Sequence, residues 1–174
     1  MSFEDRSTLR QEDGRTVLVM SSRPGYLLPL DDGREACGPY VAAMRRERIG
    51  LAVVLLTPEE ISLFYGFDLC RRYAEGRIEA LHFPIEDGSV PDDLASFHHL
   101  VRTIRDRLVS QNVLVHCNAG LGRTGVVAAG LLVLGGAPAD AAIARVRKAR
   151  SGTLENRGQE AFIRGYERSL RTGP

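Results

Sequence analysis

The stretch NVLVHCNAGLGRTGVVAAGLLVL, residues 112–134, contains three successive patterns. NVLVH (112–116) is a short apolar run, typical of a strand buried on both faces of a sheet. VVAAGLLVL (126–134) is apolar all round, which is typical of a buried helix. The loop between them is rich in glycine. A strand, a glycine-rich loop and a helix in this order predict an anion site, because N–H groups of the loop and of the helix N-terminus can point at one ligand.

Two side chains of this loop indicate what kind of anion site it is. Arg123 carries a planar guanidinium that can bind two oxygens of a phosphate group. The loop lacks the Gly-Lys-Ser/Thr of magnesium-nucleotide sites and has Cys117 at its base instead. The positive field that attracts phosphate also stabilises a thiolate. The pattern therefore predicts an ionised cysteine nucleophile that faces phosphorus.

Working outward from the loop, strand-like and helix-like patterns alternate along the chain. Apolar runs that predict strands alternate with segments whose apolar residues recur three and four apart, and the segment after Pro58 has a possible break at Gly66. This alternation predicts an α/β fold with a central, mostly parallel sheet of four to five strands and helices on both faces. The ligand should then lie beyond the carboxyl ends of the strands. We expect strands at 16–21, 51–56, 78–83 and 112–116, and helices at 35–49, 58–76, 91–108, 126–134, 139–150 and 156–170.

Composition limits the class of protein. The 174 residues are 44% hydrophobic and 26% charged with a net charge of +1, and no apolar run is long enough to span a bilayer. We expect one domain over residues 1–174, with a loose polar tail at 1–14 and a cytoplasmic location, because no signal-peptide pattern is present. The near-zero charge argues against a general nucleic-acid binder. The three cysteines, Cys37, Cys70 and Cys117, have no metal-finger spacing and should be free thiols.

The segment HCNAGLGRTG (116–125) resembles the His-Cys-x-x-x-x-x-Arg-Ser/Thr-Gly signature of cysteine-dependent protein tyrosine and dual-specificity phosphatases. This resemblance implies that Cys117 takes the phosphoryl group as a thiophosphate ester and that Arg123 binds phosphate and stabilises the transition state. It also implies that Thr124 stabilises the departing thiolate and that His116 orders the loop, with no metal and no cofactor. The implied phosphate-binding residues are Asn118, Ala119, Gly120, Leu121, Gly122 and Arg123.

An acid loop should precede the signature, because the first step expels an alkoxide or phenoxide that needs a proton. The segment FPIEDGSVPD (83–92) resembles the corresponding loop of kinase-associated dual-specificity phosphatases. The resemblance assigns Asp87 as general acid and later general base, with Glu86 as the fallback. Without the signature, Asp87 would read as a turn or helix-capping aspartate.

Two features after the signature have open interpretations. Gln159 lies where related enzymes carry a glutamine that positions the hydrolytic water, but Asn156 and Gln159 also read as a capping box at the start of a helix. A group of basic residues either lines the cleft and attracts anionic substrates or forms a solvated helix face. These residues are Arg145, Arg147, Lys148, Arg150 and Arg157.

The expected function is hydrolysis of phosphate esters in a phosphorylated protein or peptide, with two alternatives: specificity for phosphotyrosine, or dual specificity that extends to phosphoserine and phosphothreonine. The chain has no tryptophan, so its acid loop lacks the Trp-Pro-Asp of tyrosine-specific relatives and implies a shallower site. A phosphoinositide or RNA 5′-phosphate phosphatase is the second hypothesis, disfavoured because the loop carries no lysine. A non-catalytic phosphopeptide-binding module is the third. Cys37 and Cys70 read as packing residues, although a thiol near Cys117 would be able to trap it as a disulfide.

Overall fold

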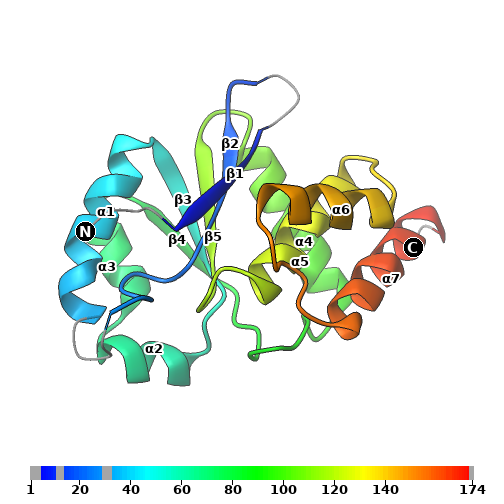
Figure 1. Cartoon of the computed structure of the whole chain (residues 1–174). Helices are drawn as coiled ribbons and strands as arrows, with labels where there is room; N and C mark the ends of the chain where they lie inside the picture. Colours follow the sequence, from blue (N-terminus) through cyan, green and yellow to red (C-terminus); the bar gives the residue numbers. More distant parts are fainter. Residues whose placement is uncertain (1–4, 11–13, 29–32, 173–174) are drawn as a thin grey trace.

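The computed structural model describes residues 5–10, 14–28 and 33–172, and it contains a five-stranded sheet in the order β1-β2-β5-β3-β4 (Figure 1). β1 pairs with β2 in antiparallel fashion, and the other neighbours are parallel. The sheet therefore matches the predicted mostly parallel α/β fold. The strands are β1 (Arg6–Arg10), β2 (Val17–Ser21), β3 (Ile49–Val54), β4 (Glu79–His82) and β5 (Asn112–His116).

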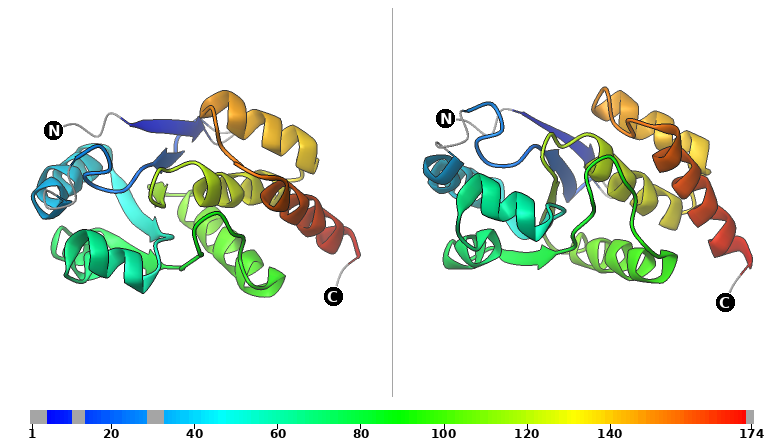
Figure 2. Two further views of the ribbon diagram at one scale, coloured as in Figure 1. Left: turned by 60° about the horizontal axis from the view of Figure 1, so that its bottom comes forward. Right: turned by 90° about the horizontal axis from the view of Figure 1, so that it is seen from below.

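Helices cover both faces of the sheet, as expected. In Figures 1 and 2 the first three helices lie on one side and the last four on the other. Connections that cross from strand to parallel strand through a helix produce this two-sided cover. The helices are α1 (Gly33–Arg46), α2 (Pro58–Tyr65), α3 (Leu69–Glu75), α4 (Leu94–Arg107), α5 (Gly122–Leu134), α6 (Ala139–Ala149) and α7 (Arg157–Thr172).

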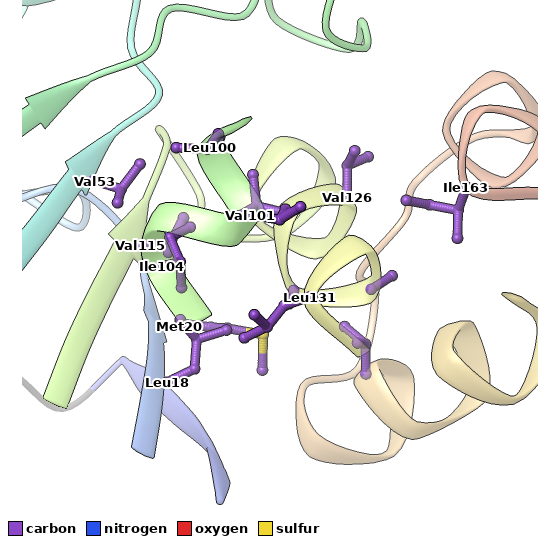
Figure 3. Close-up of a cluster of buried hydrophobic side chains, with 14 of the residues drawn as sticks. Leu18, Met20, Val53, Leu100, Val101, Ile104, Val115, Val126, Leu131 and Ile163 are labelled. Atoms are coloured by element: carbon purple, nitrogen blue, oxygen red, sulfur yellow. The ribbon is translucent and has the colours of Figure 1, made fainter. Parts of the chain in front are cut away.

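Each central strand contributes side chains to two separate hydrophobic cores, because successive side chains point to opposite faces of the sheet. In β5, Val113 and Val115 enter the core beneath α4 and α5, whereas Leu114 enters the core beneath α1 and α3. Figure 3 shows the first core, where Val101 of α4 lies near Val115 of β5 and Val126 of α5 lies toward Ile163 of α7. Burial on both faces explains why the strand sequences are continuous apolar runs.

The predicted break at Gly66 divides one expected helix into α2 and α3. Gly66 adopts φ 64°, a left-handed conformation that favours glycine and ends α2. Thr57 caps the start of α2 by accepting the N–H of Glu60, and the Glu60 side chain accepts the N–H of Thr57 in return. These two caps fix the position of α2 beside the carboxyl ends of the strands.

One prediction about the N-terminus is wrong. We expected residues 1–14 to form a loose tail, but Arg6–Arg10 form β1 at the edge of the sheet. Leu9 is the buried hydrophobic side chain of this strand, so the segment shows no apolar periodicity. Its ordering comes from backbone pairing with β2, which local sequence does not reveal. Residues 1–4 and 11–13 lie outside the described part.

Candidate active site

The loop after β5 curls around the thiol of Cys117. The backbone N–H of Gly120 donates a hydrogen bond to Cys117 Sγ at 3.2 Å, and α5 begins two residues later. Gly120 has φ 72°, and a Cβ there would lie 2.3 Å from the Ser21 carbonyl carbon. Only glycine fits this position. Loop N–H groups and the α5 N-terminus thus surround a buried thiol, which is 3% exposed, with a positive field.

Three successive carbonyl groups of the loop are held from the outside. The backbone N–H of Arg23 donates to Asn118 O at 2.9 Å. The Arg150 guanidinium donates to Ala119 O at 3.0 Å and to Gly120 O at 2.8 Å. Because the two ends of a peptide unit point in opposite directions, these bonds favour N–H groups that face the inside of the loop.

Arg150 is itself held by the N-terminal segment. Its guanidinium forms two hydrogen bonds with the Asp5 carboxylate, at 2.9 and 2.8 Å. Burial opposes the charged form of Asp5, but the hydrogen bonds from Arg150 and Ser22 and the Arg150 charge lower its pKa below the usual value. The residue just before β1 therefore supports, through Arg150, the loop at 117–121, which is called the phosphate loop below after its expected ligand.

Arg123 lies at the centre of the site and is 1% exposed. Its Nη1 and Nη2 donate to the two oxygens of Glu60 at 2.7 and 2.9 Å, and Nη1 also donates to Ile85 O at 2.9 Å. Nη2 lies 2.8 Å from Asp87 Oδ1. Burial alone would lower the pKa of Arg123, but the Glu60 hydrogen bond and the charges of Cys117, Glu60 and Asp87 raise it. The guanidinium is thus a permanent cation in a fixed orientation.

Glu60 is a site residue that sequence reasoning missed. The capping box made of Thr57 and Glu60 was readable as a helix start, but a second role for the same carboxylate was not. The bidentate pair with Arg123 is the strong form of this interaction. Burial raises the pKa of Glu60, but hydrogen bonds from Arg123 and Thr57 more than offset this and lower it. Glu60 therefore stays ionised and orients Arg123.

Two buried polar atoms of the site have no hydrogen-bond partner in the described part of the chain. They are Nε of Arg123 and Oγ1 of Thr124. Buried polar groups are nearly always hydrogen-bonded, so a buried donor without a hydrogen bond indicates a possible ligand-binding role. Both atoms belong to the first turn of α5, directly after the loop that surrounds Cys117. They are available to an oxyanion or to a sulfur atom.

The acid loop lies against Arg123 through Asp87. Among the described residues it is Asp87, rather than the fallback Glu86, that pairs with Arg123, and the Asp87 side chain is 74% exposed. Gly88 follows with φ 70°, which completes a turn from Glu86 to Ser89. Asn156 donates from Nδ2 to Gly88 O at 2.8 Å and so ties this loop to the start of α7.

Gln159 makes the helix-start contacts and also reaches the phosphate loop. Its N–H donates to Asn156 Oδ1 at 3.0 Å, and its Oε1 accepts the N–H of Glu155 at 2.8 Å. A Cβ on Gly122 would lie 2.8 Å from Gln159 Nε2 and 1.9 Å from Glu155 Oε2. The fully buried Gln159 and the exposed Glu155 thus border the first residue of α5. The water-positioning role of Gln159 stays a prediction.

His116 is buried beneath the loop. Its Nδ1 lies 3.2 Å from Cys117 O and its Nε2 lies 3.0 Å from the Tyr73 hydroxyl. Since a carbonyl only accepts, Nδ1 carries the proton and Nε2 accepts from Tyr73. Burial, together with the Arg123 and Arg23 charges, lowers the pKa of His116 from 6.5 to about 4. A neutral imidazole therefore joins the base of the loop to α3.

This lowered pKa predicts a pH-dependent stability. As pH falls below 6.5 the unfolded chain protonates His116 while the folded chain does not, until about pH 4. The stabilisation is thus present above pH 6.5 and declines between pH 6.5 and 4, by roughly 3 kcal/mol in total. Urea unfolding of the wild type and His116→Gln across this range measures it. We expect the stability advantage of the wild type to shrink with falling pH; a constant difference would contradict the assignment.

Cys37 and Cys70 lie away from Cys117, and two arginines of the basic group that follows the signature have structural contacts. Cys37 and Cys70 pack in the core under α1 and α3, on the opposite face from the core that contains Cys117. Arg147 bonds Thr153 O and Leu154 O and pairs with Glu160. Arg150 holds the carbonyl groups of Ala119 and Gly120, so the side chains of these two arginines are engaged in contacts and do not form a free solvated face.

No helix in the described ranges combines the length and apolar character that crossing a membrane requires.

Comparison with known proteins agrees with this geometry. Residues 35–137 match the family described as "Polymorphic toxin system, DSP-PTPase phosphatase". The mouse protein tyrosine phosphatase domain-containing protein 1 is 35% identical over 99 residues, which are 56% of this chain and 13% of the mouse protein. The zebrafish (Danio rerio) counterpart is 33% identical over 99 residues, which are 56% of this chain and 14% of that protein. The chain thus spans only a small part of these relatives.

Solved structures show the same fold. Kinase-associated phosphatase, crystallised with its catalytic-site cysteine replaced by serine, has a TM-score of 0.84 and 25% identity, with 97% of both chains covered. The active form of Tk-PTP has a TM-score of 0.69 and 26% identity, with 93% of this chain and 97% of that chain covered. PTPMT1 in complex with PI(5)P shares the fold at 18% identity, with a TM-score of 0.69 and 89% and 92% covered. The chain belongs to the DSP-PTPase phosphatase family whose description matches its residues 35–137.

Proposed function

We propose that this protein hydrolyses phosphotyrosine, and also phosphoserine and phosphothreonine, in proteins or peptides through a phosphocysteine intermediate. The observation that carries the proposal is the hydrogen bond from Gly120 N–H to Cys117 Sγ inside a loop that ends in a fully buried Arg123. Loop N–H groups and one oriented guanidinium together form a site for a tetrahedral oxyanion, with sulfur at its base. Kinase-associated phosphatase, which has the highest TM-score of the structures compared above, has a catalytic-site cysteine, and this supports the assignment of a cysteine nucleophile here.

In the first step, Cys117 Sγ attacks phosphorus and the bond to the ester oxygen breaks. The leaving oxygen takes the proton of Asp87, so a neutral alcohol or phenol departs. Arg123 neutralises the charge on the equatorial oxygens, for which its unpaired Nε is available. The product is a thiophosphate ester on Cys117.

In the second step, water attacks phosphorus, Asp87 accepts a proton from that water, and the S–P bond breaks. Cys117 leaves as a thiolate and inorganic phosphate is released. The buried, unpartnered hydroxyl of Thr124 is suited to donate a hydrogen bond to the departing sulfur. Gln159, which borders Gly122, is suited to orient the water.

The ion pair between Asp87 and Arg123 describes the site before substrate binds. A phosphate dianion and the Asp87 carboxylate compete for the same Nη2. Binding of substrate therefore releases Asp87 from Arg123. Asp87 is 74% exposed, so water can solvate its carboxylate once the phosphate dianion has taken its place on the buried Arg123.

Asp87→Asn should separate the role of Asp87 as general acid from its role as ion-pair partner of Arg123. We expect hydrolysis of aryl phosphates with poor leaving groups to fall about 10²- to 10⁴-fold, whereas substrates with good leaving groups are affected less. The alkaline limb of the pH–rate profile should disappear, because no acid then needs to stay protonated. Inorganic phosphate should bind more tightly, since the competing carboxylate is gone. Unchanged hydrolysis of poor leaving groups would exclude Asp87 as the acid, and Glu86→Gln is the matched control.

Substrate class is tested by comparing turnover of three substrates at equal concentration with EDTA and a thiol reductant present. They are phosphotyrosine peptides, phosphoserine or phosphothreonine peptides, and a short-chain phosphatidylinositol monophosphate. Turnover of peptides above the lipid supports the proposal. Preference for the lipid would replace it with the phosphoinositide hypothesis. Peptide binding without turnover would indicate a binding module.

A further inference from the structure

Arg23 lies beside the phosphate loop and is a buried cation. It follows β2 at the carboxyl end of the strand and is only 5% exposed. Within the described part of the chain no carboxylate forms an ion pair with it, although buried arginines are seldom unpaired. Burying a charge without a direct ion-pair partner costs free energy, so the presence of Arg23 at this place needs a reason.

The side chain of Arg23 is aimed at the residue that follows the nucleophile. Its Nε donates to Asn118 Oδ1 at 2.9 Å, and its own backbone N–H donates to Asn118 O at 2.9 Å. Asn118 is therefore held at both its side chain and its main chain. A third bond, from Nη1 to Pro24 O at 3.1 Å, fixes the guanidinium itself.

An aromatic ring packs against the guanidinium of Arg23. The guanidinium carbon lies 3.9 Å from the centre of the Phe64 ring. Phe64 lies one helical turn after Glu60 on α2, so the two residues share a face of that helix. Glu60 holds Arg123, and the Arg23 charge also acts on Glu60. One face of α2 thus supports two arginines: Arg123 of the signature segment, through Glu60, and Arg23 beside it, through Phe64.

We propose that Arg23 is a positioning residue of the phosphate site. It holds Asn118 so that the loop N–H groups face the phosphate, and its unpaired charge strengthens the attraction for the dianion. The inference rests on the proposed function only in taking phosphate as the ligand. Unlike Arg123, Arg23 is not proposed to touch the reacting atoms.

The test compares phosphate binding and turnover in variants. Arg23→Met keeps the long stem against Phe64 but removes the donors and the charge, and Arg23→Lys restores the charge alone. Arg34→Met is the matched control, because Arg34 also approaches an aromatic ring, at 5.8 Å from Phe67, and donates to a backbone oxygen, Tyr65 O, but not to the phosphate loop. Affinity for inorganic phosphate is measured by calorimetry, and kcat and KM with p-nitrophenyl phosphate.

We expect Arg23→Met to weaken phosphate binding and to reduce kcat/KM, each by roughly 10- to 100-fold, the range for hydrogen bonds to charged groups. Arg23→Lys should recover part of the phosphate affinity, and Arg34→Met should change neither quantity more than about twofold. Adding Asn118→Ala to Arg23→Met should weaken phosphate binding little further, because both substitutions remove the same hydrogen bond between Arg23 and Asn118. The pH dependence of kcat should keep its shape.

Wild-type phosphate affinity in folded Arg23→Met would overturn the proposal. So would a double variant, Arg23→Met with Asn118→Ala, whose fold-loss of phosphate affinity equals the product of the two single losses. If Arg23→Met does not fold, Arg23→Lys and Asn118→Ala decide by the same affinity measurement: wild-type affinity in both overturns the proposal, and weakened affinity in both supports it. A wild type that binds phosphate without turnover would contradict the proposed function and leave this comparison intact.

Discussion

Cys117→Ser is expected to abolish turnover of p-nitrophenyl phosphate, with a loss of at least about 10⁴-fold, comparable to removal of other catalytic nucleophiles. A serine hydroxyl stays protonated at neutral pH and is a poor nucleophile without an adjacent base. Binding of phosphate esters should persist, because the N–H groups of the loop and Arg123 remain. Steady-state hydrolysis and calorimetric titration with a non-hydrolysed phosphopeptide measure the two quantities separately.

The matched control for this variant is Cys37→Ser, which alters a thiol in the other core, on the opposite face of the sheet. It should keep turnover while losing some stability. Residual wild-type activity in Cys117→Ser would contradict the thiolate mechanism. Loss of binding together with turnover, in a folded protein, would show that the sulfur also shapes the loop.

Arg123→Lys is the second change with a large expected effect, a decrease in kcat of roughly 10³-fold or more, in the range seen for transition-state arginines. A lysine ammonium is a point charge and cannot reproduce a fork that bonds Glu60 with both terminal nitrogens while Nε is free for the ligand. Phosphate affinity should also fall, because ground state and transition state share this contact. Single-turnover kinetics and phosphate titration report the two losses.

Folding of Arg123→Lys must be verified by its urea unfolding curve, because Glu60 would lose part of its pairing and unpaired buried charges cost about 3–5 kcal/mol. Arg164→Lys, which alters an exposed arginine of α7 paired with Asp140 and Glu160, is the matched control and should be neutral. Near-wild-type kcat in a folded Arg123→Lys protein would exclude the bidentate role.

The phosphate loop and its flanking elements were predictable from sequence because their contacts are local. Residues 112–134 form β5, the loop and a helix in the expected order, although α5 begins at Gly122, four residues before the expected start. The hydrogen bond from Gly120 to Cys117 spans three positions. The break at Gly66 follows from a left-handed glycine, and the two-sided cover of the sheet follows from continuous apolar strands. Each of these features depends on residues that are close together in the sequence.

The supports of the site were decided by tertiary structure alone. Glu60 reaches Arg123 across 63 positions, Arg23 reaches Asn118 across 95, and Asp5 reaches Arg150 across 145. In sequence, Asp5 was expected in a loose tail and Arg150 was one of several basic residues, and Glu60 was not singled out. No local pattern marks such pairs, because parallel strands bring together residues that lie far apart along the chain. The sequence by itself determined the family signature and the local strand–loop–helix structure, and the folded sheet determined which distant charges hold that loop in place.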